Sequence, residues 1–311
     1  MAHDHDHGHH PHDHRHGHDR SPPGSHLIFA AGTALNLAFV AIEVWYGVKS
    51  NSLALLSDAA HNLSDVFALL IAWAAFQLGK SLPTKRRTYG LRRSSILAAL
   101  ANALVLLVVV GGIVWEAIGR LAQPEAVAAG TVMGVAAVGV AVNGLTALMF
   151  MAGRKQDLNI NGAFLHMAAD AAVSLGVVLA GLGILMSGWN WLDPAVSIVV
   201  GAVIIGSTWG LLWESLSLAM DAVPAGIDSG AVEAYLAALP GVTTVHDLHI
   251  WGMSTTEVAL TAHLVMPQPP ADDQLLGVVC HELRERYRIG HVTIQIEHGD
   301  IDCRQAPAHV V

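Results

Sequence analysis

The chain has 311 residues, of which 53% are hydrophobic and only 13% are charged, and its mean hydropathy is +0.48. Charged residues make up about a quarter of a typical soluble protein, so this composition predicts an integral membrane protein. The long apolar runs exclude a disordered chain, and two cysteines, Cys280 and Cys303, are too few for a disulfide scaffold. The formal net charge of −9 argues against a nucleic-acid partner.

Residues 1–26 form a His-rich N-terminal tail. Its first 20 residues hold nine of the 19 histidines and four aspartates, with almost nothing apolar to bury. This composition predicts disorder in the absence of metal. Asp, Gly and Pro interrupt the histidines, which favours a natural metal-collecting tail over an expression tag. A secretory signal would need a basic start and an apolar run, so we expect the tail to stay in the cytoplasm.

A membrane domain is predicted over residues 27–220, because six apolar stretches each reach the length of about 20 residues that crosses a bilayer. The stretches are 27–48, 53–79, 94–121, 126–152, 160–187 and 192–216. The connection between the second and third stretches is rich in basic residues: Lys80, Lys85, Arg86, Arg87, Arg92 and Arg93. Arg154 and Lys155 lie on the same side, whereas the opposite connections carry only Lys49 and Arg120. The positive-inside rule therefore predicts cytoplasmic basic loops and cytoplasmic termini.

Residues 221–299 are predicted to form a separate α+β domain. From Asp221 to the end the chain has 12 acidic and 4 basic residues, which is typical of a soluble segment. A helix over 228–239, capped by Asp228, precedes alternating runs at 244–251 and 258–266, a helix near 272–288 and a strand at 291–297. Residues 300–311 are predicted to be a loose C-terminal tail.

The second and fifth stretches share the pattern His-x-x-x-Asp, as His61 with Asp65 and His166 with Asp170. An ionisable side chain at the bilayer centre costs at least ~2.5 to 3.5 kcal/mol, so it needs a partner or a function. Residues i and i+4 share a helix face. Two such helices facing each other would place two imidazoles and two carboxylates around one point, a four-coordinate set that suits Zn²⁺.

Other polar residues in the predicted spans have simpler explanations. A single His-x-x-x-Asp pair could be a local hydrogen bond that fixes helix packing, but the second copy favours a metal site. Asp58 shares the face of His61, and we expect it to orient an imidazole or pass protons rather than bind metal. Glu43 and Glu116 lie toward the outer ends, where water contact is expected. Helix packing or interface roles are expected for the five polar residues of the spans outside the His-x-x-x-Asp pairs and Asp58: Asn36, Glu43, Asn102, Glu116 and Asn143.

Four runs closely resemble the cation diffusion facilitator family, in particular its zinc-transporter-like members: SLALLSDAAHNLSD (52–65), HMAADAAVSLGV (166–177), LDPAVSIVVG (192–201) and VHDLHIW (245–251). The similarity extends over about residues 27–298. The resemblance implies a homodimer that moves Zn²⁺ out of the cytoplasm in exchange for protons, with six transmembrane helices and a cytoplasmic ferredoxin-like domain. It places the transport site on His61, Asp65, His166 and Asp170, with zinc as substrate and no separate cofactor.

The resemblance also implies a cytoplasmic zinc site at the dimer interface, where the ion would be structural or regulatory. Its ligands fall on His246, His263 and Glu297; a solvated histidine at a strand end is the simpler alternative. Strand alternation places His246 and His249 on opposite faces, so they are not expected to share a site. Weaker candidates are His249, His281, His291 and His298. Cys303 could bind a soft metal, but Cys280 and Cys303 lack Cys-x-x-Cys spacing, which favours ordinary thiols at both positions.

Two other functions compete with export, namely an intramembrane metalloenzyme and a metal-sensing membrane scaffold. A catalytic zinc site keeps a position open for water, whereas two His and two Asp already fill four positions. A scaffold would leave the ligands in the spans unexplained. The sequence therefore predicts a secondary transporter in a bacterial inner membrane, with metal ions, protons and lipid as its partners.

Deletion of residues 2–20 tests the role of the tail. We expect a lower apparent affinity for zinc with little change in maximal flux, because flexible histidines raise the local metal concentration without touching the permeation step. Zinc flux into proteoliposomes, measured over a range of zinc concentrations, gives both quantities. Complete loss of transport by a correctly inserted truncation would show that the tail does more than capture metal.

Overall fold

The computed structural model describes residues 25–79, 81–151, 158–300 and 303. The first six elements are α1 (Ser25–Ser50), α2 (Leu53–Gly79), α3 (Ser94–Ala122), α4 (Ala129–Met151), α5 (Leu158–Ser187) and α6 (Leu192–Ala219). The C-terminal elements are α7 (Ser229–Ala237), β1 (Thr244–Gly252), β2 (Val258–Val265), α8 (Gln274–Tyr287) and β3 (His291–Glu297). This is the predicted order of elements. The His-rich segment 1–24, Lys80, Arg154, Lys155 and the segment 304–311 lie outside the described residues.

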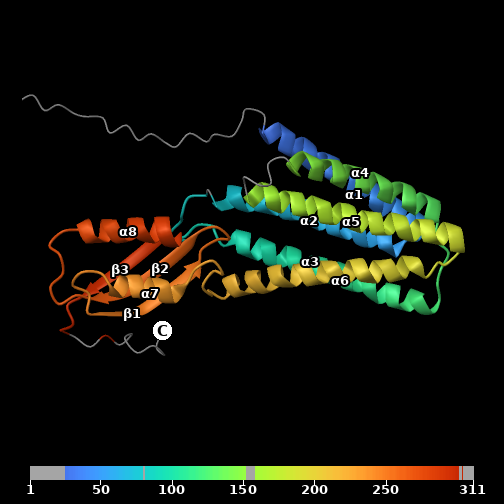
Figure 1. Ribbon diagram of the computed structural model, residues 1–311. Coiled ribbons are helices and arrows are strands. Elements are labelled where there is room, and N and C mark those ends of the chain that lie inside the picture. The colour runs from blue at the N-terminus through green and yellow to red at the C-terminus, as the bar shows by residue number, and fades with distance from the viewer. Residues whose placement is uncertain (1–24, 80, 152–157, 301–302, 304–311) are drawn as a thin grey trace, which may run out of the picture.

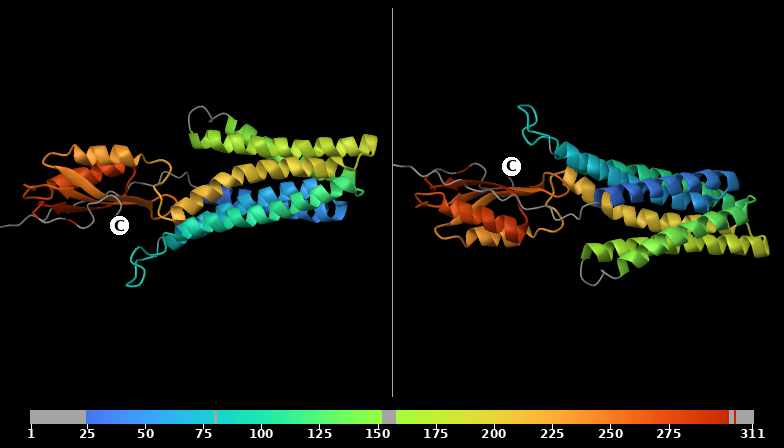
Figure 2. Two further views of the ribbon diagram at one scale, coloured as in Figure 1. Left: turned by 90° about the horizontal axis from the view of Figure 1, so that it is seen from below. Right: turned by 90° about the horizontal axis from the view of Figure 1, so that it is seen from above.

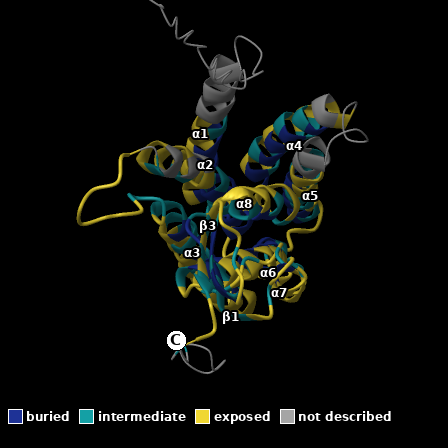
Figure 3. Cartoon of the chain, turned by 90° about the vertical axis from the view of Figure 1, so that its left-hand side faces the viewer, coloured by how far each residue is buried: buried dark blue, intermediate teal, exposed yellow. Residues whose placement is uncertain are grey.

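The long helices form a bundle whose outer surface is apolar. Within the bundle α4 packs along α5 and α3 packs along α6. Figure 3 shows that exposed positions cover the outside of the helices, and on α3 they include Val105, Val108 and Trp115. An apolar outer surface of this extent is typical of contact with lipid or protein rather than water. Four described segments are long and apolar enough to cross a bilayer: 94–122, 129–148, 164–187 and 192–219.

Close packing and polar contacts hold α6 against its neighbours. Buried side chains from α3 and α6 form one cluster that contains Val110 and Val200. A Cβ atom added at Gly201 would lie 2.4 Å from Cγ2 of Val114, so α3 and α6 approach closely at this residue. At the start of α6 the buried Asp193 carboxylate accepts hydrogen bonds from the Leu53 amide, at 2.8 Å, and from the Ser52 hydroxyl. These contacts bind the first turn of α2 to α6.

The C-terminal domain is a three-stranded sheet with two helices. The strand order is β1-β2-β3, with β1 and β2 antiparallel and β2 and β3 parallel. A parallel pair needs a long crossover, which α8 supplies. Asp228 caps α7 as predicted, because its side chain accepts a hydrogen bond from the Ala231 amide at 3.1 Å. The core joins the sheet to both helices through Leu236, Leu260 and Leu283.

The C-terminal domain lies beyond one end of the helical bundle in every view (Figures 1 and 2). The connection from α2 to α3 reaches it there. Arg92 forms an ion pair with Glu257 at 2.9 Å, and Arg93 forms one with Asp221. The Thr255 amide donates a hydrogen bond to the Ser95 hydroxyl at 3.1 Å. The most basic connection and the C-terminal domain therefore lie at the same end of the bundle.

Substitution of Gly201 by Ala tests the close approach of α3 and α6. The added methyl group would overlap Val114, so we expect a loss of about 1 to 3 kcal/mol of stability and a lower thermal midpoint in detergent. Gly206→Ala on the same helix is the matched control, because no described atom lies within 4 Å of its added Cβ position. Equal midpoints for the two variants would contradict the packing argument.

Candidate metal centres

Two helices bring His61, Asp65, His166 and Asp170 together, and we call these four residues the intramembrane cluster. Each histidine lies nearest to the aspartate of the other helix. The Nε2 atom of His61 is 3.0 Å from Oδ1 of Asp170, and Nε2 of His166 is 3.3 Å from Oδ2 of Asp65. The contacts within α2 and within α5 are longer, at 3.8 and 3.7 Å. The i, i+4 spacing thus supplies both side chains of each helix, and the packing of α2 beside α5 joins the two pairs.

These distances suit a small tetrahedral cation. Ligand atoms around zinc at about 2.0 to 2.1 Å are separated by roughly 3.3 Å. The four His–Asp contacts of the intramembrane cluster span 3.0 to 3.8 Å, and His61, Asp65 and Asp170 each offer a ligand atom within 4.8 Å of the other two. His166 lies outside that closer group, so its imidazole would have to move inward to complete a four-ligand shell. Two ionised carboxylates and two neutral imidazoles would balance a divalent charge. The donor set of nitrogen and oxygen matches the preference of borderline metals such as Zn²⁺.

Exposure within the intramembrane cluster is graded along the bundle. The side chain of His166 is 45% exposed and that of Asp65 is 31% exposed, whereas His61 is 18% and Asp170 is 3% exposed. The more exposed pair lies nearer the end that carries the C-terminal domain, because α2 runs toward that end and α5 runs away from it. The ligands nearer the C-terminal domain are therefore the more exposed ones, and Asp170, farther from it, is the most covered.

Polar contacts bring the helix ends together on the covered side. The Arg120 guanidinium donates hydrogen bonds to the backbone oxygen of Asn51 at 3.1 Å and to its side-chain oxygen at 2.9 Å. The Asn51 side chain in turn donates to Glu125 at 2.7 Å. These bonds link the α1–α2 connection to the end of α3 and to the segment before α4. Glu116 is exposed and pairs with Arg120 at 3.1 Å, as expected for a residue near the outer end.

Two further carboxylates are buried beside the intramembrane cluster. Asp58 accepts a hydrogen bond from the Ser174 hydroxyl at 2.8 Å, so its partner is on α5 and is not an imidazole. Glu43 accepts a hydrogen bond from the Asn62 amide group at 3.0 Å. Glu43 is fully buried between α1 and α2 rather than in contact with water, and its bond to Asn62 agrees with the helix-packing role expected for it. Both residues join neighbouring helices through neutral hydrogen-bond donors.

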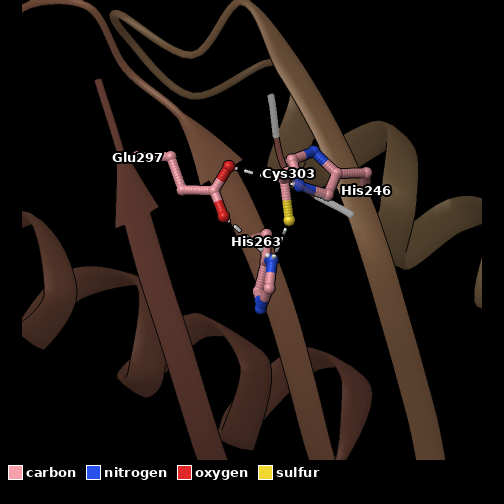
Figure 4. A group of neighbouring side chains, drawn as sticks. All are labelled: His246, His263, Glu297 and Cys303. Carbon is pink, nitrogen blue, oxygen red and sulfur yellow. Dashed lines mark hydrogen bonds and ion pairs between the residues drawn. The ribbon is translucent and has the colours of Figure 1, made fainter. Parts of the chain in front are cut away.

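A second group of metal-binding side chains lies in the C-terminal domain, and we call it the C-terminal cluster. His246 on β1 and His263 on β2 are cross-strand partners, and Glu297 ends β3 opposite Val265 of β2. Glu297 lies 3.3 Å from Nε2 of His246 and 3.1 Å from Nδ1 of His263. Cys303 joins the group, with its sulfur 3.7 Å from Nδ1 of His263 (Figure 4). One ligand atom from each of the four residues lies within 4.8 Å of the others.

The sequence favours an ordinary thiol at Cys303, whereas the structure places its sulfur beside His263 among side chains that could hold a metal. Cys-x-x-Cys spacing does not identify a single cysteine of this kind. A usable signal was its position six residues after Glu297, since a short segment beyond the last strand can fold back over the strand end. The other thiol, Cys280, is exposed on α8, outside the cluster.

A β-bulge interrupts the alternation predicted for β1. Three steps from His246 to His249 oppose only two steps on β2, and Asp247 has a φ angle of +50°. The bulge brings the Asp247 carboxylate to 2.9 Å from Nε2 of His249 and 3.4 Å from Nε2 of His263. Regular alternation, on which the opposite faces of His246 and His249 were predicted, is therefore interrupted between these two residues. His249 pairs with Asp247 and lies outside the four-residue cluster.

The three weakest histidine candidates fall in neither cluster. The ring of His291 makes an edge contact with Tyr89 of the α2–α3 connection, with centroids 5.6 Å apart. His281 on α8 and His298 after β3 are exposed. Their positions in the described part of the chain give no sign of a shared metal.

Comparison with known proteins places the two parts of the chain in one family. The cation efflux transmembrane domain matches residues 12–219, and the cytoplasmic domain of cation efflux proteins matches residues 224–299. The metal cation efflux system protein CzcD of Cupriavidus metallidurans is 37% identical over 288 residues, which cover 92% of this chain and 90% of that protein. The zinc transporter ZitB of Escherichia coli K12 is 36% identical over 274 residues, covering 88% and 87%.

Two further matches are a third curated relative and a solved structure. The cadmium, cobalt and zinc/H(+)-K(+) antiporter of Bacillus subtilis 168 is 37% identical over 269 residues, covering 83% of this chain and 85% of that protein. A solved metal-bound C-terminal domain of CzcD from Cupriavidus metallidurans is 36% identical, with a TM-score of 0.21, and covers 23% of this chain and 99% of that one. The chain belongs to the cation efflux, or cation diffusion facilitator, family, and it is a metal cation transporter rather than an enzyme.

Proposed function

We propose that the protein exports Zn²⁺ from the cytoplasm in exchange for protons, with His61, Asp65, His166 and Asp170 as the transport site. The observation that carries the proposal is the cross-helix pairing of two imidazoles and two carboxylates at 3.0 to 3.8 Å. Relatives named as zinc transporters and as a cadmium, cobalt and zinc antiporter support this class of substrate. Four filled positions also speak against a catalytic zinc, which needs one open position.

Exchange with protons follows from the chemistry of the ligands. Imidazole binds metal only when it is neutral, and carboxylate binds metal best when it is ionised, so protons and metal compete for the same atoms. When the site faces the cytoplasm it loads metal, and when it faces the outer compartment entering protons displace the metal. The structure has its more exposed ligands toward the C-terminal domain, which corresponds to the loading state of an alternating-access cycle.

The proposed topology has six transmembrane helices, α1 to α6, and cytoplasmic termini. Positive charge near α2 and α3 favours this orientation, and so does the contact of Arg92 and Arg93 with the C-terminal domain. The corresponding division is a His-rich tail over 1–26, a membrane domain over 27–220, a cytoplasmic ferredoxin-like domain over 221–299 and a short tail over 300–311. A bacterial inner membrane is the proposed location.

We propose that zinc at His246, His263 and Glu297 has a structural or regulatory role in a homodimer. Ligands from all three strands converge there, so a bound ion would fix the sheet edge. A metal that binds only the folded, assembled domain adds its binding free energy to assembly. The C-terminal domain would in this way stabilise the dimer when cytoplasmic zinc is plentiful.

Alanine at each of His61, Asp65, His166 and Asp170 tests the transport site. We expect each variant to insert normally but to lower initial zinc flux to the level of empty liposomes, because a buried four-coordinate shell with one ligand missing is incomplete. His281→Ala is the matched control, since it removes an exposed imidazole outside both clusters. Normal flux in any two of the four variants would disprove the four-ligand assignment.

Replacement of His61 by Asp tests the metal preference. The variant exchanges a neutral nitrogen ligand for an anionic oxygen ligand, so we expect relatively faster flux of harder or larger ions such as Mn²⁺ and Cd²⁺. We also expect a changed pH dependence, because imidazole and carboxylate titrate more than two units apart in water. Initial zinc, cadmium and manganese fluxes at several pH values give both results. An unchanged ranking of metals and an unchanged pH profile would mean that His61 does not bind the metal.

A further inference from the structure

His246 has a buried nitrogen that lacks a hydrogen-bond partner. Its side chain is only 8% exposed, and Nε2 lies 3.3 Å from Glu297 in a geometry that makes no hydrogen bond. A buried polar atom without a partner costs about 1 to 3 kcal/mol, so an unpaired imidazole nitrogen at a strand end calls for an explanation. A metal ion that accepts its lone pair would supply one.

Cys303 lies where a fourth ligand would be needed. Its sulfur is 3.7 Å from Nδ1 of His263, and that nitrogen is 3.1 Å from Oε1 of Glu297. Figure 4 shows one side chain from each strand, namely His246, His263 and Glu297, directed with Cys303 at a common point. The four ligand atoms all lie within 4.8 Å of one another, close enough for one ion to contact all four after adjustment of the side chains.

We propose that the Cys303 thiolate is the fourth ligand of the C-terminal metal site, beside His246, His263 and Glu297. This inference rests on the proposed zinc site of that domain and adds a ligand that closes it within one protomer. Two nitrogens, one oxygen and one sulfur complete a tetrahedral shell, so no coordination position stays open for water. Closed sites of this kind are structural, and the thiolate favours Zn²⁺ and Cd²⁺ over hard ions such as Mn²⁺ and Mg²⁺.

The two metal centres would then differ in softness and in exchange rate. The intramembrane cluster offers only nitrogen and oxygen and must release its ion in every cycle. The C-terminal cluster offers a sulfur ligand and is held by three strands, so it would keep its ion through many cycles. A retained Zn²⁺ in the C-terminal domain would therefore belong to the folded protein rather than to the transported pool.

Competition between zinc and a thiol reagent tests the proposal on the full-length protein in detergent. A metal-bound thiolate reacts slowly with maleimide, so we expect zinc to slow modification of Cys303 by at least tenfold, as read by mass spectrometry of each cysteine. Cys280 in the same molecule is the internal control, because it is exposed on α8 and should react at the same rate with and without zinc. The histidine-rich tail does not affect this readout, which reports thiols alone.

A variant at a second ligand makes the outcome specific. In His263→Ala the protection of Cys303 should disappear, and the protein should bind one zinc fewer per chain. Protection that persists in this variant, or an absence of protection in the parent, would overturn the role of Cys303. If Cys303 is unprotected but His263→Ala still loses one zinc, the C-terminal site stands without the thiolate. If neither quantity changes, the C-terminal site itself is wrong, and zinc flux reports separately on the transport function.

Discussion

The arrangement of the membrane domain depends on how two carboxylates are kept inside an apolar bundle. Asp65 and Asp170 lie among helices whose outer surfaces are apolar, and a lone charge there would be strongly unfavourable. Each carboxylate faces an imidazole from the opposite helix, at 3.3 and 3.0 Å. The pairing holds α2 against α5, and the same four groups are the proposed site for a divalent cation. Stability of the bundle and affinity for metal therefore have a common origin.

The remaining buried polar groups support this arrangement without competing for the metal. Asp58 and Glu43 accept hydrogen bonds from Ser174 and Asn62, and the two carboxyl groups also lie against each other. Asp193 likewise accepts a hydrogen bond at the first turn of α2. The helices are thus tied together by short polar contacts on the covered side, whereas the side toward the C-terminal domain leaves His166 accessible. In this structure the exposed part of the intramembrane cluster therefore lies toward the C-terminal domain.

Much of this architecture could be predicted from the sequence, because its signals are local. Apolar runs of span length predicted the long helices, and the i, i+4 spacing predicted which side chains of α2 and α5 share a face. What failed depends on tertiary structure. The bulge at Asp247 arises from the register of β1 against β2, and Cys303 reaches the cluster only because the chain returns over the end of β3. Burial of Glu43 depends on the helix that covers it, which helical periodicity alone does not identify.

The contacts of Arg92 and Arg93 link the biogenesis of the protein to its mature form. During insertion, in the proposed topology, these positive charges hold the α2–α3 connection on the cytoplasmic side. After folding, the same two guanidinium groups bind Glu257 and Asp221 and so dock the C-terminal domain beneath the bundle. The same pair of charges thus first helps to set the orientation of the chain in the membrane. After folding, it contacts the C-terminal domain, which is synthesised last.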